Sequence, residues 1–346
     1  MHLTRILTGL AGLIIIAAPA ITQPGVSSRY DFLTLDYPGS LDYPGSNFPL
    51  GINNKREVVG FFTDNMGVAH GYLWKKGKFT TIDFPGAPLV AFGGTFAGGI
   101  NDRGDIAGLH IDKNGFEHGY LRAMPAWCGA DEGDDDDQKT CRPVFTSIDV
   151  PGAAQTTGIV FELGTGLGTA VIGINNSGVT TGLYATHSLY SNGFSLHHGV
   201  FSPYSQPAAS HMAGHGTKFF GVSNSGIIAG DYLPQANLQS PVITHAFLLD
   251  ENRVTPIDFA GAAAGGFGVQ VTGVNTSREA IGAFTDQTGV LHAFFWKAGN
   301  FFRVDYPGAP FNEAHSINDH GEITGGYATD VTGMHTHGFI AIPKDR

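Results

Sequence analysis

The chain has 346 residues, of which 42% are hydrophobic, 14% are charged and 50 are glycine. This composition is typical of a turn-rich globular β protein and excludes a disordered chain. The formal net charge of −11 argues against nucleic acids and anionic membrane surfaces as partners.

The first 20 residues have the organisation of a secretory signal peptide. Arg5 precedes an apolar run from Ile6 to Ala17, and residues 18–20 (APA) provide a small-residue cleavage site. The run is too short to span a bilayer, and we expect no membrane insertion elsewhere. We therefore predict a secreted protein, extracellular or periplasmic, with a short linker at residues 21–29 before the folded domain.

From residue 30 onward the sequence repeats one unit of four short strands, seen most clearly in residues 51–87. In that copy the turn that begins at Gly51 (GINN) leads to strands expected at residues 57–62, 70–74 and 79–84. Aromatic and β-branched residues at short spacing, interrupted by turn residues, indicate an all-β fold. The turns of the other copies begin at Gly99, Gly173, Gly221, Gly273 and Ser316.

The two ends of the repeat region complement each other. Residues 32–39 (FLTLDYPG) form a fourth strand with nothing before it, and the sixth copy stops after its third strand. We therefore predict one domain over residues 30–346, a six-bladed β-propeller of four-stranded blades in which the N-terminal strand completes the C-terminal blade. An open β-solenoid, which needs a cap at each end, is the alternative. The third copy has no recognisable fourth strand after its HHGVF segment at His197.

Six of the 15 histidines are expected at the same position of the third strand. A residue that recurs in every blade indicates packing or hydrogen bonding rather than six active sites. We predict that each imidazole bonds the aspartate of a fourth strand. The histidines are His70, His118, His198, His245, His292 and His337, and the aspartates are Asp83, Asp149, Asp258, Asp305 and, at the ring closure, Asp36.

These residues also carry a family resemblance. The tripeptides His245-Ala246-Phe247 and His292-Ala293-Phe294, with the GINN-type turns and the IDFPGA strand ends, resemble the bacterial extracellular HAF-repeat family. The resemblance covers most of residues 30–342, although most copies have HGY, HGV or HGF instead. It implies a secreted repeat protein and brings no catalytic residues to carry over.

An acidic insertion at residues 123–144 contains both cysteines of the chain. Cys128 and Cys141 are close in sequence and are predicted to form a disulfide in an exported protein. Five aspartates and one glutamate lie between them, and carboxylate oxygens are the ligands that Ca²⁺ prefers. Their spacing does not match an EF-hand loop, so we favour a solvated acidic bulge over a calcium site.

Function is expected from the residues that do not repeat. The loops that join second to third strands, and those that join blades, are long and variable and share one face, which we call the long-loop face. We predict a monomeric binding or scaffold protein that holds a carbohydrate or protein there. The aromatic candidates for binding are Phe92, Phe96, Phe161, Tyr204, Phe267 and Phe311.

A glycan-active hydrolase or lyase at the mouth of the central channel is the alternative function. The candidates for its catalytic groups are Glu162, Asp231, Glu313 and His315, and His211 and His215 (HMAGH) are weak candidates for Zn²⁺ ligands. The sequence contains no nucleophile elbow, phosphate-binding loop or dinucleotide fingerprint. We therefore expect a binding protein rather than an enzyme and no cofactor, with Ca²⁺ or Zn²⁺ as the exceptions to test.

Overall fold

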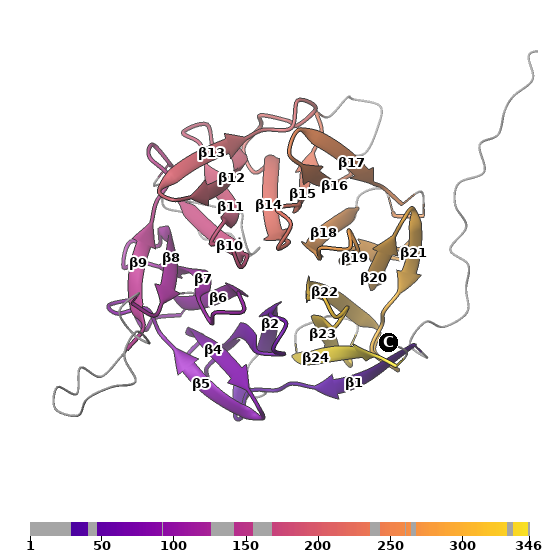
Figure 1. Ribbon diagram of the computed structural model, residues 1–346, viewed down its shortest axis with the longest axis horizontal. Helices are drawn as coiled ribbons and strands as arrows, with labels where there is room; N and C mark the ends of the chain where they lie inside the picture. The colour runs from indigo at the N-terminus through magenta and orange to yellow at the C-terminus, as the bar shows by residue number, and fades with distance from the viewer. Residues whose placement is uncertain are drawn as a thin grey trace, which may run out of the picture.

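The structure is a computed structural model that describes residues 29–40, 47–91, 93–125, 142–154, 168–235, 243–259, 261–263, 268–330 and 335–344. In these residues the chain forms 24 strands. Figure 1 shows them as six antiparallel blades arranged in a ring around a central axis. The fold is an all-β, six-bladed propeller of four-stranded blades, as the repeats predict.

Each blade runs from an innermost to an outermost strand. Blade 1 contains β2 (Asn47–Ile52), β3 (Val58–Thr63), β4 (Ala69–Lys75) and β5 (Lys78–Ile82). Blade 2 contains β6 (Gly94–Ile100), β7 (Ile106–Ile111), β8 (Glu117–Ala123) and β9 (Val144–Ile148). Blade 3 contains β10 (Thr169–Ile174), β11 (Thr180–Ala185), β12 (Ser191–His197) and β13 (Val200–Tyr204).

The second half of the ring repeats this order. Blade 4 contains β14 (Gly216–Val222), β15 (Ile228–Leu233), β16 (His245–Asp250) and β17 (Arg253–Ile257). Blade 5 contains β18 (Val269–Val274), β19 (Ala280–Thr285), β20 (Leu291–Lys297) and β21 (Asn300–Arg303). Blade 6 contains β22 (Phe311–Ile317), β23 (Ile323–Ala328) and β24 (Thr336–Pro343), with β1 (Tyr30–Thr34) as its outermost strand.

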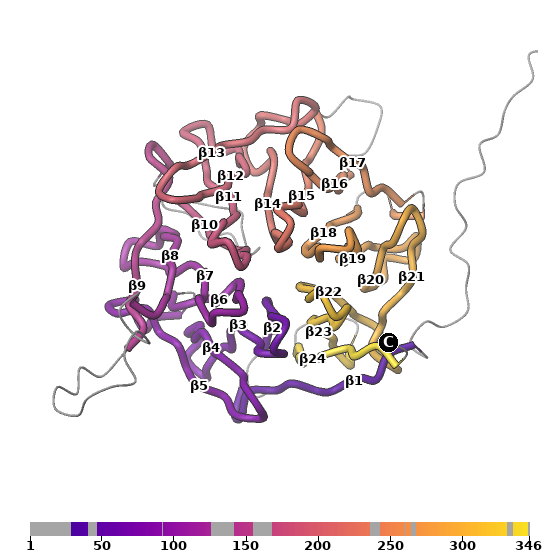
Figure 2. Tube along the Cα trace, viewed as in Figure 1, coloured from indigo at the N-terminus to yellow at the C-terminus, as the bar shows by residue number. Residues whose placement is uncertain are grey.

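The ring closes where the two ends of the repeat region meet. Strand β1 pairs antiparallel with β24, from Tyr30 opposite Pro343 to Thr34 opposite Phe339. Figure 2 shows the indigo start of the trace beside its yellow end. Leu35, which follows β1, is 2% exposed and packs with Ile52 of blade 1 and Ile340 of blade 6. The closure predicted from the offset of the repeats is confirmed.

Glycine in the repeated turn allows the innermost strands to touch through their backbones. A Cβ added at Gly51 would lie 2.8 Å from the carbonyl oxygen of Gly98 in the next blade. One added at Gly173 would lie 2.6 Å from the carbonyl oxygen of Phe220. Since both distances are too short for a side chain, the GINN motif requires glycine for close approach rather than for turn geometry.

The asparagine that follows two residues later fixes the turn and links the blades. Asn53 Oδ1 accepts hydrogen bonds from the backbone N–H groups of Lys55 (3.0 Å) and Glu57 (2.9 Å). Its Nδ2 donates to the carbonyl of Asn101 in blade 2 at 3.0 Å. The same link joins blades 2 to 3, 3 to 4, 5 to 6 and 6 to 1, through donors Asn101, Asn175, Asn275 and Asn318.

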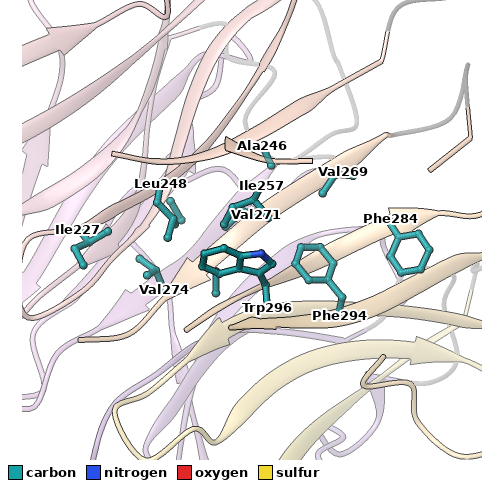
Figure 3. Close-up of a cluster of buried hydrophobic side chains, with 12 residues drawn as sticks. Ile227, Ala246, Leu248, Ile257, Val269, Val271, Val274, Phe284, Phe294 and Trp296 are labelled. Carbon is teal, nitrogen blue, oxygen red and sulfur yellow. The ribbon is translucent and has the colours of Figure 1, made fainter. Parts of the chain in front are cut away.

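The hydrophobic core lies between neighbouring blades. Figure 3 shows the cluster between blades 4 and 5, where Leu248 and Ile257 face Val271, Phe294 and Trp296. Residues of this kind repeat at every blade junction, so the core is a ring of similar interfaces. Such a ring is rigid, and it holds the inner strands at fixed positions around the axis.

Blade 3 differs from its sequence-based interpretation. It has a fourth strand, β13, and its third strand is residues 191–197. His198 therefore lies in the turn between β12 and β13, with a positive φ of 50°, and not in the third strand. Asn192 occupies the position of the histidine, opposite Tyr184 as His70 is opposite Phe62. The HHGVF segment was misleading because this blade lacks the usual histidine.

The other five histidines make the predicted hydrogen bonds to aspartates. Nδ1 of His70 lies 3.0 Å from Asp83, and the remaining pairs join third and fourth strands at similar distances. These pairs are His118–Asp149 (2.9 Å), His245–Asp258 (3.0 Å), His292–Asp305 (2.9 Å) and His337–Asp36 (3.0 Å). The last pair joins the N-terminal segment to β24 within blade 6. The repeated histidines therefore hold the third and fourth strands of one blade together.

Candidate functional site

Each innermost strand carries a β-bulge where it meets the axis. The register shifts between Pro49 and Gly51 in blade 1 and between Ala314 and Ser316 in blade 6, and at equivalent places in the other blades. A bulge re-aims a side chain and increases the local twist. We call the residues at this position the bulge ring, which comprises Leu50, Gly98, Ile172, Phe220, Thr272 and His315.

An axial cavity of about 80 Å³ lies along the central channel. Its walls include Leu50, Ile172, Thr272 and His315 of the bulge ring. Its other end is formed by residues of the tight turns that join first to second strands, on the face opposite the long loops. We call the residues at one equivalent position of the six turns the belt; they are Asn54, Asp102, Asn176, Asn224, Thr276 and Asp319, and all but Thr276 line the cavity.

Two residues before the bulge, each innermost strand carries a residue that lies closer to the long-loop face. Glu313 lies two residues before His315 in β22. The contact between their side chains shows that both lie on the same side of the strand. We call the residues at this position in the six blades the inner ring. They are Phe48, Phe96, Ala170, Lys218, Gln270 and Glu313.

The inner ring is apolar in blades 1 to 3. Phe48 stacks on its cross-strand partner Phe61 with ring centroids 5.1 Å apart, and Phe61 lies 4.7 Å from Phe96 of blade 2. Phe96 continues into a cluster with Leu109 of its own blade and with blade 3, through Ala170, Ile172 and Leu183. This half of the inner ring is therefore apolar and has two partly exposed phenylalanine rings, Phe48 and Phe96.

The inner ring is polar in blades 4 to 6. Lys218 is only 9% exposed and lies in register with Asp231 of the neighbouring strand. Gln270 and Glu313 occupy the equivalent positions in the next two blades, and their cross-strand partners are the small residues Ala283 and Gly326. The inner ring is thus aromatic and aliphatic in blades 1 to 3 and hydrogen-bonding and charged in blades 4 to 6.

Glu313 and His315 are in hydrogen-bond contact, and His315 lines the axial cavity. His315 Nδ1 lies 2.8 Å from the carbonyl oxygen of Pro49, so this nitrogen donates a hydrogen bond. Nε2 lies 3.1 Å from Glu313 Oε2. Because Nδ1 already carries hydrogen, the second contact requires either an imidazolium beside a carboxylate or a neutral imidazole beside a protonated carboxyl group.

The sequence-based candidates fall into three groups. His315 lines the axial cavity and contacts Glu313, whereas Phe96 belongs to the inner ring in blade 2 and Asp231 pairs with the inner-ring residue of blade 4. Tyr204 packs between blades, with its ring 5.2 Å from that of Phe219, and Phe311 starts β22 as a partly buried residue. The remaining binding and catalytic candidates, together with the disulfide and its acidic loop, lie outside the described residues; they are Phe92, Phe161, Glu162, Phe267, Cys128 and Cys141.

The two histidines proposed as zinc ligands lie in the loop that joins blades 3 and 4. The ring of His211 stacks on Tyr190 with centroids 4.6 Å apart, and His215 is partly buried. Within the described ranges, no three His, Cys, Asp or Glu side chains gather closely enough to hold a metal ion. The zinc and calcium sites remain predictions.

Sequence reasoning missed Phe48, Lys218 and Gln270 as channel residues. A signal was present, because each lies five residues before the first-turn residue equivalent to Asn53, as Phe96 and Glu313 do. That position differs in every blade except for the two phenylalanines. An alignment of the six copies, searched for the position that varies most between them, would have identified the inner ring.

The described part of the chain contains no helix long and apolar enough to cross a lipid bilayer.

No protein-family model matches the chain, and no curated protein matches its sequence. Solved structures resemble it in fold. A mutant of the Aleuria aurantia lectin in complex with Fucα1-6GlcNAc is 13% identical, with a TM-score of 0.48 over 88% of this chain and 98% of that one. A gluconolactonase from Xanthomonas campestris is 11% identical, with a TM-score of 0.46 over 94% and 95%. The β-propeller domain of the Trilobed protease from Pyrococcus furiosus is 9% identical, with a TM-score of 0.45 over 88% and 97%. At these identities the similarity extends to the fold alone.

Proposed function

We propose that the protein is an exported propeller that binds a carbohydrate at the long-loop mouth of its central channel. The observation that carries this proposal is the division of the inner ring into an apolar half, with Phe48 and Phe96, and a polar half, with Lys218, Gln270 and Glu313. A sugar ring has an apolar face of C–H groups and a periphery of hydroxyl groups. One half suits stacking and the other suits hydrogen bonding.

The repeated polar residues support the proposal because their side chains are already used in structural hydrogen bonds. The histidine–aspartate pairs and the turn asparagines are engaged in holding strands and blades together. The residues left to distinguish one side of the channel from the other are those of the inner ring. The signal-like segment at residues 1–20 supports export. An exported protein would meet glycans outside the cell.

A glycan array followed by calorimetry tests the proposal. The wild-type protein is expected to bind at least one class of oligosaccharide, and Phe96→Ala is expected to weaken binding at least about tenfold, since truncating an aromatic anchor costs over 1–2 kcal/mol. Phe96→Leu separates the causes, because it keeps apolar volume but removes the flat ring. Phe145→Ala, on the outer strand β9, is the matched control. Absence of binding to every glycan, or equal binding by Phe96→Leu and wild type, contradicts the proposal.

The Glu313–His315 pair favours a second candidate, a glycan hydrolase or lyase. The contact of 3.1 Å between Glu313 Oε2 and His315 Nε2 places a carboxyl group beside an imidazole, and these two groups often serve as general acid and base. An enzyme would release new reducing or unsaturated ends from a bound oligosaccharide, and Glu313→Gln would abolish their release while retaining binding. Binding without any product over a long incubation supports the binding protein instead.

A further inference from the structure

The belt closes one end of the channel with hydrogen bonds between side chains. Asn54 Nδ2 donates to Asp102 Oδ2 at 2.9 Å and to Asp319 Oδ2 at 3.0 Å, so it joins blades 1, 2 and 6. Asn224 Nδ2 of blade 4 donates to the same Asp319 oxygen at 2.9 Å. Blade 5 lies between blades 4 and 6, so this last bond joins two blades that are not neighbours in the ring.

Backbone groups hold the belt side chains in place. Asn54 N–H donates to Asp102 Oδ1 and Asp102 N–H donates to Asn176 Oδ1, both at 2.8 Å. Asp319 N–H donates to Asn54 Oδ1 at 2.9 Å, and Thr276 N–H donates to Asp319 Oδ1 at 3.0 Å. Because each side chain is bonded to a neighbouring turn, opening the belt would break several hydrogen bonds together.

Belt side chains of five blades are therefore bonded to one another across the end of the channel opposite the long loops. The axial cavity of about 80 Å³ lies between the bulge ring and the belt. A water needs about 10–15 Å³ of such volume, so the cavity has room for roughly five to eight waters. That space suits the end of a chain and is too small for a polymer to pass through.

The charges that face the channel are mostly negative. Asp102 and Asp319 form part of the belt, and burial disfavours ionisation of Asp319. Hydrogen bonds from the N–H of Thr276, from Asn224 and from Asn54 outweigh burial and hold the pKa of Asp319 below its ordinary value. Nearer the mouth, Lys218 lies beside Asp231, and Glu313 beside His315. An anionic group that enters the channel meets more carboxylates than cations.

We propose that the channel is a blind pocket that binds the terminal unit of a glycan end-on, and that this unit is neutral or carries an amino group. This inference rests on the proposed carbohydrate-binding function and specifies which part of the ligand is recognised. A chain whose terminal unit is a uronic or sialic acid is excluded by the belt carboxylates, and a chain without a free end cannot enter.

Stoichiometry distinguishes end-on binding from binding along a chain. The glycan that binds most tightly on the array is prepared at two lengths, about six and about 30 units, and titrated by calorimetry. We expect one protein per chain at both lengths, and no binding of oligogalacturonate of either length. A stoichiometry that rises with chain length overturns the end-on inference while leaving glycan binding intact. Failure of every glycan to bind overturns the proposed function, and this inference with it.

Neutralising the belt tests the charge selection. Asp319→Asn keeps an oxygen acceptor of similar size, so the belt retains part of its hydrogen bonding. The variant is expected to bind anionic-ended oligosaccharides at least tenfold more tightly than wild type, with binding of neutral chains changed less than threefold. Glu251→Gln, an exposed carboxylate in the outer turn of blade 4, is the control and should change neither. Wild-type preference for an anionic end, or unchanged discrimination in Asp319→Asn, contradicts the inference.

Discussion

Replacing Asn53 with alanine is expected to destabilise the propeller strongly, although the residue lies in a turn. Its side chain is 4% exposed and makes four hydrogen bonds. Oδ1 accepts hydrogen bonds from two backbone N–H groups of its own turn. Nδ2 donates to the carboxylate of Glu57 at 2.8 Å and to the carbonyl of Asn101 in blade 2. At about 1 kcal/mol each, their loss lowers the free energy of unfolding by about 4 kcal/mol.

The chain itself shows how serine behaves at this position. In blade 4 the equivalent residue is Ser223, whose Oγ accepts one turn bond, from Ile227 N–H at 3.0 Å. A serine cannot reach the next blade as the asparagine amide does. Asn53→Ser should therefore keep one of the four bonds and cost about 3 kcal/mol. Ser223→Asn supplies an amide toward the carbonyl of Asn275 and should stabilise the fold by about 1 kcal/mol.

Urea unfolding followed by tryptophan fluorescence measures these three differences. Asn65→Ala, at an exposed position of another turn in the same blade, is the control and should stay within about 0.5 kcal/mol of wild type. Equal destabilisation by Asn53→Ser and Asn53→Ala, or a loss of stability in Ser223→Asn, would refute the role assigned to the inter-blade amides.

Three further substitutions test burial and closure. Burial, and then the nearby charge of His118, lower the pKa of His110 from its ordinary 6.5 to about 4, so the unfolded chain takes up this proton first and stability falls as pH drops from 6.5 to 4. His110→Tyr, which places at this site the residue that blades 3, 4 and 6 have, should recover about 1–2 kcal/mol at pH 4.5 and little at pH 8. Glu117 has the opposite effect on the pH dependence of stability, because burial raises its pKa to about 7 and stability therefore falls as pH rises from 4.5 to 7. Glu117→Gln should stabilise the protein by about 1–3 kcal/mol at pH 8 and not at pH 4. Leu35→Ala should cost about 2–4 kcal/mol if the N-terminal segment closes the ring, whereas Leu33→Ala on the same segment, 42% exposed, should cost little. Thermal or urea unfolding at the stated pH values measures each one, and a pH-independent effect of His110→Tyr or equal costs of the two leucine variants would count against these assignments.

The architecture could be predicted because each blade uses the same residues for the same contacts. Glycine for close approach, asparagine for the inter-blade link and histidine for the fourth strand recur at fixed spacing, so the repeats indicate the ring before any contact is known. The orphan strand at residue 30 and the incomplete sixth copy indicated its closure. Blade 3 was misread because Asn192 replaces the histidine and His198 follows a few residues later.

The candidate site could be predicted only in part, because it is assembled from residues that do not repeat. Phe96, Glu313 and His315 could be identified as polar or aromatic residues near loops, but nothing in the sequence places Phe48 and Phe96 against the same ring, Phe61. This arrangement depends on the register of two blades and on the bulge in each inner strand. The belt could not be predicted, since its hydrogen bonds join turns of different blades that meet only when the ring is closed.

A crystal structure of the protein with its tightest-binding oligosaccharide tests most directly whether the non-repeated residues of the channel bind the ligand. We predict that the terminal sugar lies in the channel mouth, with one face on Phe48 or Phe96 and its hydroxyl groups toward Gln270 and Glu313, and that the rest of the chain extends between the long loops. A sugar bound on the outer strands, between two blades, or on the belt side of the molecule would contradict this assignment.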